Sequence, residues 1–253
     1  MTSGRPSITA AVIARDEETM IGDCLRSITW ADELLVLVDA ASCDRTTEIA
    51  RCHGARVEEE PFRDFAAQRD RALRLATGEW VLFVDADERV APALRDEVLA
   101  TVAAAGEHVG FWVPRDNYIC GRLMRGAGWS PDYQLRLLKR GAARFDPKRV
   151  VHEQALLDGA AGHLRNALIH LNYRTLGEFV RKQERYASLE AQRWLAIYGR
   201  PRRRALLGQP AREFLRRYVQ LRGYREGMLG LLLSVLLAWY TGKAVWLARH
   251  GCP

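Results

Sequence analysis

The first hundred residues alternate short apolar segments with stretches of helical periodicity, and this alternation restricts the fold more than any other feature of the chain. Segments that alternate in this way build a parallel sheet covered by helices. The predicted strands are 8–14, 34–38, 56–58 and 80–84. One predicted helix lies around 20–28. A second begins at Asp44, which can cap it, and ends at Gly54. A third begins at its cap Asp64 and ends at Gly78, with Phe65, Leu73 and Ala76 toward the core. The sequence therefore predicts an α/β fold.

After a further helix over 92–105 the pattern changes. From Val109 onward it consists of shorter strand-like pieces without helices between them, which indicates a mixed sheet with an antiparallel extension. A long helix over 175–198 follows, and the basic run 200–204 interrupts the helical pattern. The chain thus predicts a sheet domain followed by a helical C-terminal extension.

The C-terminal extension is basic and apolar at once. The chain carries a net charge of +7, and from Arg200 onward eleven Lys or Arg stand against Glu213 and Glu226. Such asymmetry indicates an anionic partner, either phospholipid or nucleic acid. Residues 227–242 carry no charge, but a spanning helix needs about twenty apolar residues. We therefore expect an amphipathic helix at a membrane interface, with a helix packed on the core or in a dimer as the alternative.

Two carboxylates follow the predicted strand 80–84 at once, in the run Asp85-Ala86-Asp87-Glu88. In open α/β sheets, ligands bind at the carboxyl ends of strands. A divalent cation held there by Asp85 and Asp87 would neutralise a departing diphosphate. Asp39 also ends a strand, and its carboxylate can accept the imide N–H of uracil. The pattern favours a site for a nucleotide and a metal, Mg²⁺ or Mn²⁺.

Four blocks in the first ninety residues resemble glycosyltransferases of family 2, which have the GT-A fold. These blocks are 9–18, 38–46, 68–70 and 85–87, in the order and spacing of that family. The resemblance implies a mixed sheet flanked by helices and a UDP-sugar donor. It implies donor contacts by Ala14, Arg15, Glu17, Asp39, Arg69, Asp85 and Ala86. It also implies that Asp87 ligates the metal and that Asp85 lies near the ribose or the metal.

Residues 128–137 and 151–153 resemble blocks of a subgroup that includes lipopolysaccharide core glucosyltransferases. An inverting transfer needs one base to deprotonate the acceptor hydroxyl. Asp132 is the candidate base, because the family tends to carry its acidic base there, and Glu153 is the second candidate. If their segment is a strand, Gln134 and Arg136 share a face and can reach the donor phosphates or the acceptor. His152 is a candidate third metal ligand, with a structural histidine as the equal alternative.

The resemblance divides the chain into a catalytic domain over 1–172 and a helical extension over 173–253. Within the domain, 1–106 form the nucleotide-sugar half and 107–172 the acceptor half. The function expected is inverting transfer of a sugar, glucose from UDP-glucose, to a lipopolysaccharide-core or other lipid-linked acceptor. Because the N-terminus lacks the apolar run of a secretory signal, we expect peripheral attachment to the cytoplasmic side of the inner membrane.

Other classes fit the same residues less well. Arg15-Asp16-Glu17-Glu18 stands where a nucleotidyltransferase would have a basic, glycine-rich loop and a dehydrogenase its G-x-G-x-x-G. A basic nucleic-acid-binding or non-catalytic nucleotide-binding protein is the remaining alternative. It leaves the carboxylates at the strand ends unexplained, since they repel a phosphate backbone. We therefore expect no nucleic acid as partner.

Overall fold

The computed structural model describes residues 4–145 and 155–251. The chain forms two compact units, the first from Met1–Arg115 and Asp132–His170, the second from Asp116–Pro131 and Leu171–Pro253. The predicted domain division at residues 172 and 173 stays a prediction. Residues 116–131, which that prediction placed in the acceptor half, group with the helical unit.

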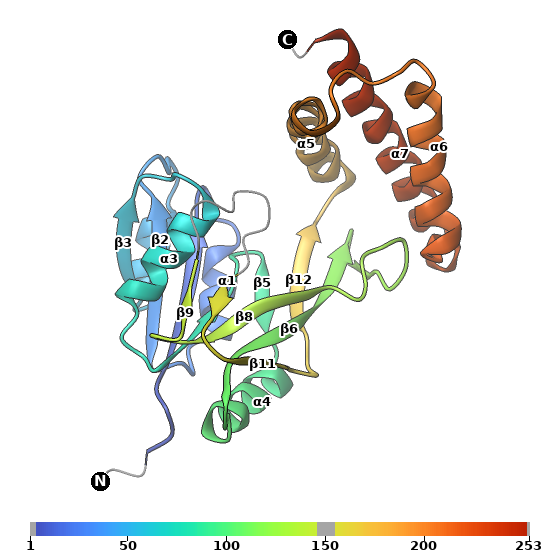
Figure 1. The fold of residues 1–253 in the computed structure, drawn as a ribbon. Coiled ribbons are helices and arrows are strands. Elements are labelled where there is room, and N and C mark those ends of the chain that lie inside the picture. Colours follow the sequence, from blue (N-terminus) through green and yellow to red (C-terminus); the bar gives the residue numbers. More distant parts are fainter. Residues whose placement is uncertain (1–3, 146–154, 252–253) are drawn as a thin grey trace. The chain divides into compact units, whose positions relative to one another are not determined.

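Parallel strands form the N-terminal half of the sheet in the first unit (Figure 1). They are β1 (Ile8–Ala14), β2 (Glu33–Asp39), β3 (Arg56–Glu60) and β4 (Trp80–Phe83). The central strands are apolar and buried because helices cover both faces of the sheet. β1 pairs in parallel with β2 and with β4, so their carboxyl ends meet at one edge. The predicted parallel sheet is confirmed.

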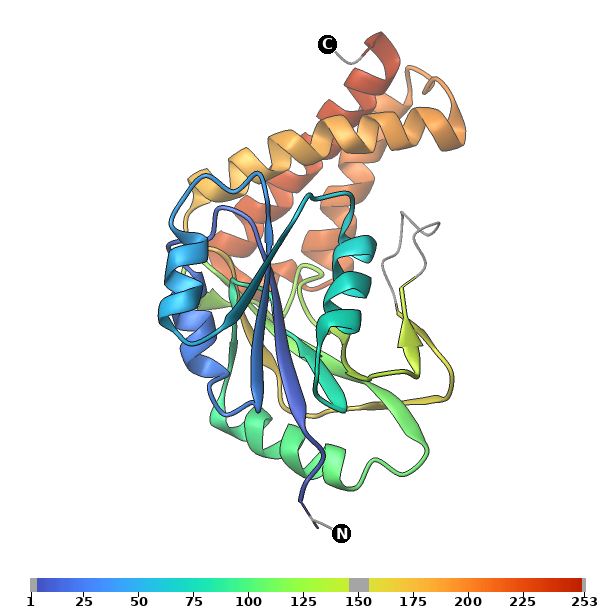
Figure 2. The ribbon, with the colours of Figure 1, turned by 90° about the vertical axis from the view of Figure 1, so that its left-hand side faces the viewer.

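Helices lie on both sides of these strands, as Figure 2 shows. The two sides are covered by α1 (Ile21–Ser27) and α2 (Thr46–Cys52), and by α3 (Phe65–Leu75). Asp64 caps α3 as predicted, accepting a hydrogen bond of 2.7 Å from the amide of Ala67. Leu73 and Ala76 are buried, but the prediction for Phe65 was wrong. Phe65 begins the helix on its outer side, is 50% exposed and packs edge-on against Phe62.

The sheet continues with antiparallel strands in the order β3-β2-β1-β4-β8-β6-β12-β5. β8 (Tyr133–Lys139) lies antiparallel between β4 and β6 (His108–Ile119), and β12 (Leu168–Tyr173) pairs with β5 (Glu88–Val90). α4 (Pro92–Ala103) leads into β6. The remaining short strands are β7 (Arg122–Leu123), β9 (Ala143–Arg144), β10 (Leu156–Leu157) and β11 (Ala160–His163). The antiparallel extension is confirmed, although β6 is longer than the short pieces expected.

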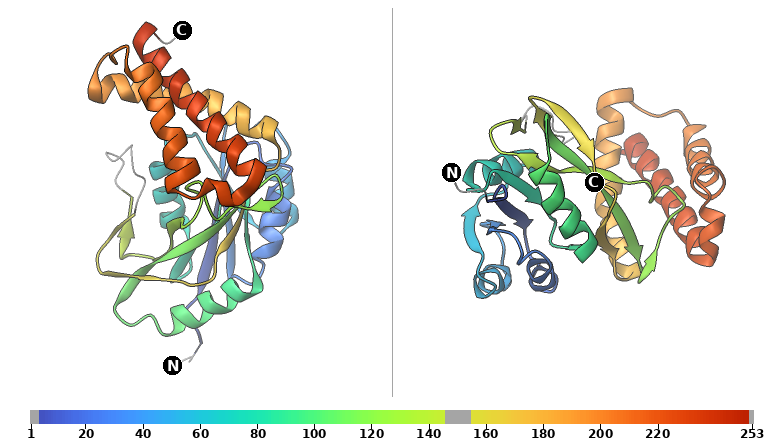
Figure 3. Two further views of the ribbon diagram at one scale, coloured as in Figure 1. Left: turned by 90° about the vertical axis from the view of Figure 1, so that its right-hand side faces the viewer. Right: turned by 90° about the horizontal axis from the view of Figure 1, so that it is seen from below.

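The second unit is mainly helical and contains α5 (Leu176–Tyr198), α6 (Ala205–Leu215) and α7 (Gly227–His250). A π-helical turn, η1 (Arg216–Gln220), and a 3₁₀ turn, η2 (Gly223–Glu226), join the last two helices. Figure 3 shows α6 and α7 side by side. Phe179 of α5 and Leu233 of α7 share one apolar cluster with Ile119, Met124 and Tyr173. This cluster attaches the helices to residues 116–131.

α7 is longer than the apolar segment seen in the sequence. It continues past Lys243 to His250, and Ala244, Val245, Leu247 and Ala248 are buried in this last part. Lys243 forms an ion pair with Glu184 of α5. By length and composition, 223–250 could cross a membrane. However, 44% of its most apolar window is buried within the protein. The same helix therefore also serves as the core of the second unit.

Candidate active site

The carboxyl ends of β1, β2 and β4 bring together the polar residues predicted from the N-terminal motifs. Arg15 follows β1, Asp39 ends β2, and Asp85 lies two residues beyond β4. This edge is where open α/β sheets bind their ligands.

Asp39 is held rigidly at the end of β2. Its side chain is 5% exposed, and Oδ1 accepts hydrogen bonds from the amides of Ala41 (3.0 Å) and Phe62 (3.2 Å). These bonds, Ala41 first, and the nearby Arg15 lower the pKa of Asp39. Oδ2 lies 3.0 Å from Arg15 Nη1 but accepts no well-directed hydrogen bond within the described residues. This buried oxygen thus faces Arg15 and keeps hydrogen-bonding capacity for a further donor, such as a base N–H.

The loops after β1 and β2 are bound to each other. Asp16 has a left-handed backbone (φ 53°), and its Oδ1 accepts from the amide of Cys43 at 2.8 Å. The amide of Glu17 donates to Thr46 Oγ1 at 2.8 Å. These bonds fix the path of the chain from Ala14 to Glu17, including Arg15, beside Asp39. The predicted donor-contacting residues Ala14, Arg15 and Glu17 therefore lie together at the sheet edge.

Asp85 begins the turn after β4 and faces two arginines. Arg136 Nη1 lies 3.0 Å from Asp85 Oδ1, its Nη2 contacts Oδ2, and Arg69 Nη2 lies 3.5 Å from Oδ1. Burial alone would raise the pKa of Asp85, but the charges of Arg136 and Arg69 lower it well below the usual range. Asp85 is therefore an anion that the protein itself neutralises.

Arg136 is 3% exposed and lies within this carboxylate cluster. Its predicted contact with the donor phosphates or the acceptor stays a prediction. Its Nη2 lies 3.1 Å from Oε1 of Glu88, which is fully buried. Burial raises the pKa of Glu88, and the charge of Arg136 offsets part of that rise. Glu88 also holds the turn, because its Oε2 accepts from the amide of Asp85 at 2.9 Å. The sequence motif contained Glu88, but this role was not predicted.

Asp132, the predicted base, lies at the other end of the same ion-pair chain. Arg115 Nη2 is 2.7 Å from Asp132 Oδ2, and Arg115 Nη1 is 3.3 Å from Glu88 Oε1. Gln134 Nε2 donates to Asp132 Oδ1 at 2.8 Å. Opposite charges thus alternate from Asp85 through Arg136, Glu88 and Arg115 to Asp132. Gln134, predicted to contact the donor or the acceptor, orients this carboxylate.

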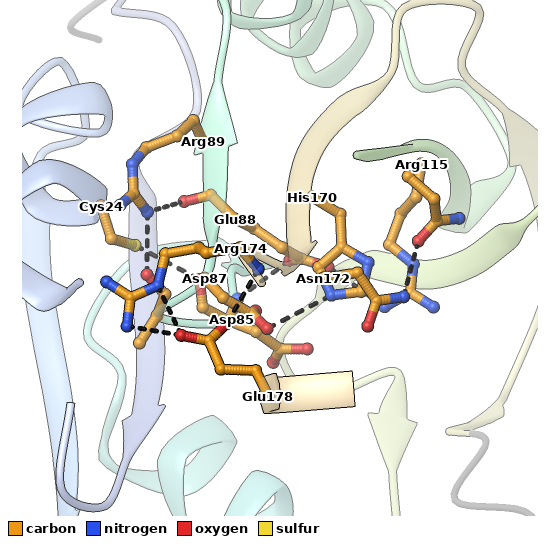
Figure 4. A network of polar contacts seen from close by, with 12 residues as sticks. Cys24, Asp85, Asp87, Glu88, Arg89, Arg115, His170, Asn172, Arg174 and Glu178 are labelled. Carbon is orange, nitrogen blue, oxygen red and sulfur yellow. Dashed lines mark hydrogen bonds and ion pairs between the residues drawn. The ribbon is translucent and has the colours of Figure 1, made fainter. Parts of the chain in front are cut away.

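Asp87 is paired with a histidine that the sequence did not single out. His170 Nε2 on β12 lies 3.3 Å from Asp87 Oδ2, and Figure 4 shows the two side chains with Glu88 and Arg115. His170 is 7% exposed. The signal available in the sequence was one histidine inside the apolar strand 168–173. The sequence did not reveal Asp87 as its partner. The pairing of β12 with β5 sets His170 opposite Glu88 and thereby next to Asp87.

Two predicted residues, His152 and Glu153, lie outside the described part of the chain. Among the residues that the structure describes, no group of three or more His, Cys, Asp or Glu is placed to hold a metal. Asp87 and His170 supply one oxygen and one nitrogen donor. Such a pair fits a cation that completes its shell with diphosphate oxygens and water. Ala86 lies buried between the two aspartates, and its carbonyl oxygen accepts a hydrogen bond of 2.8 Å from Arg89 Nη1.

The profile of the family described as "Glycosyl transferase family 2" matches residues 9–155, which include the strand edge, the D-x-D turn and Asp132. The chain belongs to this family. It is a glycosyltransferase with a GT-A-like mixed sheet flanked by helices. The resemblance found in the N-terminal motifs is thereby confirmed.

Relatives of this family 2 glycosyltransferase include the lipopolysaccharide core biosynthesis glycosyltransferase LpsC of Rhizobium meliloti. The two are 31% identical over 249 residues, which cover 91% of this chain and 90% of LpsC. An uncharacterized glycosyltransferase of Rickettsia conorii is 33% identical over 36% of this chain and 32% of its own length. The structure of the mannosyltransferase PcManGT from Pyrobaculum calidifontis matches with a TM-score of 0.56 at 17% identity. That match covers 97% of this chain and 88% of PcManGT, and it shows the shared fold.

Proposed function

We propose that this glycosyltransferase moves a sugar from a UDP-sugar, expected to be UDP-glucose, to a lipopolysaccharide-core or other lipid-linked saccharide, with inversion. The observation that carries the proposal is the meeting of Asp39, whose buried Oδ2 faces Arg15, and the pair of Asp87 and His170 at one end of the sheet. The first suits a nucleobase N–H, and the second suits a cation on a diphosphate.

The donor would lie along the edge formed by β1, β2 and β4. Asp39 Oδ2 would accept the N–H of the base. A Mg²⁺ or Mn²⁺ ion held by Asp87 and His170 would neutralise the charge that develops on the diphosphate. Asp85 and Arg69 would line the ribose and phosphate region. PcManGT, which shares the fold, is described in complex with GDP-mannose and Mn²⁺, and this supports the general kind of donor.

In the transfer itself, the acceptor hydroxyl would lose its proton to an oxygen of Asp132. The acceptor oxygen would then bond to the anomeric carbon, and the bond from that carbon to the diphosphate oxygen would break with its electron pair on the diphosphate. Arg115 and Gln134 hold Asp132 in place through bonds of 2.7–2.9 Å. Because general-base catalysis contributes about 10²–10⁴ in rate, Asp132→Asn should lower kcat by that factor.

Donor binding provides the control for this variant. Asp132→Asn should bind UDP with manganese as the wild type does, whereas the exposed Asp158→Asn should change neither binding nor rate. Unchanged transfer in Asp132→Asn would remove Asp132 as the base and favour Glu153.

The acceptor class rests on LpsC and on the surface of α7. Side chains spaced three, four or seven residues apart are exposed along one side of this helix: Met228, Leu232, Val235, Trp239 and Trp246. We call this set the α7 stripe. Together with the arginines between residues 200 and 225, it suits an anionic membrane surface. We infer peripheral attachment to the cytoplasmic side of the inner membrane, where nucleotide-sugars are available.

A nucleotide screen tests the donor site. Thermal unfolding would be followed with UDP, GDP, CMP and NAD, each with and without manganese. Stabilisation by UDP that requires the metal is the expected result. Equal stabilisation by GDP would change the donor base. No response to any nucleotide, combined with salt-sensitive DNA binding stronger than binding to anionic lipid, would favour the nucleic-acid-binding alternative.

A further inference from the structure

A polar cavity lies within the helical unit. It has a volume of about 540 Å³ and is formed by residues 123–130 and by the turn 220–226. Arg125, Arg222 and Arg225 line it, together with Ser130, Gln220 and Glu226. None of the residues assigned above to the donor or the base is among those that line it.

The arginines of this cavity differ from others in the same unit in their pairing. Arg216 and Arg217 both form ion pairs with Glu213. Arg125, Arg222 and Arg225 are exposed, and no ion pair or side-chain hydrogen bond of theirs is found within the described residues. Three arginines therefore line one cavity, and within the described residues none of them is paired with a carboxylate.

Glu226 carries the one carboxylate among the described lining residues, and this carboxylate accepts hydrogen bonds from backbone amides. Its side chain is 8% exposed, and Oε1 accepts from the amides of Arg125 (3.0 Å) and Gly126 (2.6 Å). This arrangement fixes the chain at Arg125 beside the turn that carries Arg222 and Arg225. The carboxylate thus stabilises the backbone of the cavity wall and forms no ion pair with the three arginines among the described residues.

The walls are further locked by close backbone contacts. The amide of Ala127 donates to the carbonyl of Leu221 at 2.7 Å, and Arg217 Nη1 donates to the carbonyl of Ala127 at 2.8 Å. A Cβ on Gly126 would lie 2.7 Å from the carbonyl oxygen of Arg222, so only glycine allows this approach. Arg222 itself has a φ of 55°, a conformation that a non-glycine residue keeps only where its surroundings enforce it. The cavity is therefore preformed in the folded chain.

We propose that this cavity binds the anionic substituent, a phosphate or a carboxylate, of the saccharide acceptor. Guanidinium groups bind such oxyanions in bidentate fashion. Ser130 and Gln220 add hydroxyl and amide groups that suit sugar hydroxyls. The proposal rests on the proposed glycosyl transfer and adds a feature of its acceptor, namely a negative charge. A phospholipid headgroup offers the same oxyanion chemistry and is the alternative source of the ligand.

The test compares Arg125→Gln/Arg225→Gln with a control that removes the same charge elsewhere, Arg181→Gln/Arg185→Gln on the exposed side of α5. Binding of glucose 6-phosphate and of glucose would be titrated with the donor site saturated by UDP and manganese. Vesicles of phosphatidylcholine, with and without phosphatidylglycerol, form the second arm. Should the double variant fail to fold, Arg225→Gln alone would be used.

The wild type should bind glucose 6-phosphate more tightly than glucose, and the double variant should lose about tenfold or more of this affinity, as expected for charge-assisted hydrogen bonds. The control should keep it. Unchanged phosphosugar binding in the double variant, or equal loss in the control, would overturn the proposal. A loss confined to phosphatidylglycerol vesicles would assign the cavity to lipid headgroups instead. UDP binding with manganese should be the same in all variants, so its failure would count against the proposed function and not against the cavity.

Discussion

At the scale of single residues, the cation site proposed above depends on Asp87 and His170. They come from different parts of the chain, the turn after β4 and strand β12, and their side chains lie 3.3 Å apart. Asp87 is partly shielded from water, and His170 is buried. A ligand pair preformed in this way needs little reorganisation when the cation and diphosphate bind.

Replacing His170 should therefore weaken binding of the nucleotide only when the metal is present. We expect His170→Ala to lower the affinity for UDP with manganese by about tenfold or more, the size of effect seen when groups that support a metal are lost. Calorimetric titration with and without manganese measures this difference. His250→Ala, an exposed histidine of the helical unit, is the control. Equal loss of metal-free UDP binding would show that His170 acts only as a structural residue.

Arg136 gives a second prediction at this scale, concerning stability. It is the buried counterion of both Asp85 and Glu88. Removing one partner of a buried ion pair leaves the other charge uncompensated and costs about 3–5 kcal/mol. Arg136→Met should lower the free energy of unfolding by that amount in urea denaturation. Lys139→Met on the same strand, where the pair with Glu79 is exposed and 3.7 Å long, should change it by less than about 1 kcal/mol.

At the scale of secondary-structure elements, the parallel strands and their helices were predictable because local signals and burial agree there. The apolar run 8–14, the cap at Asp64 and Pro92 at the start of α4 each correspond to the observed element. The outward position of Phe65 was not predictable, since helical periodicity fixes a face only when the contacting layer is known. Asp44, expected to cap α2, accepts from the amide of Thr46 (2.9 Å), while Arg45 occupies the N-cap position.

The polar network of the site shows the same limit. Strand-end carboxylates such as Asp39 and Asp85 could be placed from sequence, because the strand order and the site share one edge. The other ionisable residues of the network, Arg136, Arg115 and His170, come from strands whose pairing is set by long-range contacts. Sequence spacing alone does not reveal such contacts, and it did not reveal the buried role of Arg136.

The junction between α7 and η2 allows a prediction at the element scale. A Cβ on Gly230 would lie 2.1 Å from the carbonyl oxygen of Gly223, so α7 would have to move away from the turn. Gly230→Ala should lower the free energy of unfolding by about 1–3 kcal/mol, the usual cost of overpacking. Gly208→Ala in α6 is the matched control, because nothing lies within 4 Å of its added Cβ. It should leave stability unchanged or raise it by about 0.5–1 kcal/mol. Thermal or urea unfolding would compare them, and equal effects would contradict the close packing.

At the scale of the whole molecule, the residues proposed for the chemistry and those proposed for membrane attachment belong to different compact units. The ion-pair chain from Asp85 to Asp132 lies within the first unit, whereas the α7 stripe and the unpaired arginines lie within the second. Changes to the surface of the second unit should therefore leave donor binding intact. This separation allows membrane attachment and donor binding to be tested independently.

Membrane attachment should depend on the α7 stripe. Trp239 is 69% exposed and Met228 is 77% exposed, so placing a carboxylate at either position costs the folded protein little. Met228→Glu/Trp239→Glu should reduce co-sedimentation with vesicles containing phosphatidylglycerol by about tenfold or more, since apolar contact area is lost and negative charge is added. The control is Phe65→Glu, an exposed aromatic residue of the first unit. Unchanged vesicle binding would show that the α7 stripe does not contact lipid.

Release of UDP from UDP-glucose, in the presence of extracted lipopolysaccharide core, tests whether the chain is a metal-assisted transferase with its cation at Asp87. The assay would be run with manganese and with EDTA, on the wild type and on Asp87→Ala. Acceptor-dependent release that requires manganese and is lost in Asp87→Ala is the predicted result. Release that continues in EDTA, or that survives in Asp87→Ala with unchanged metal dependence, would contradict it.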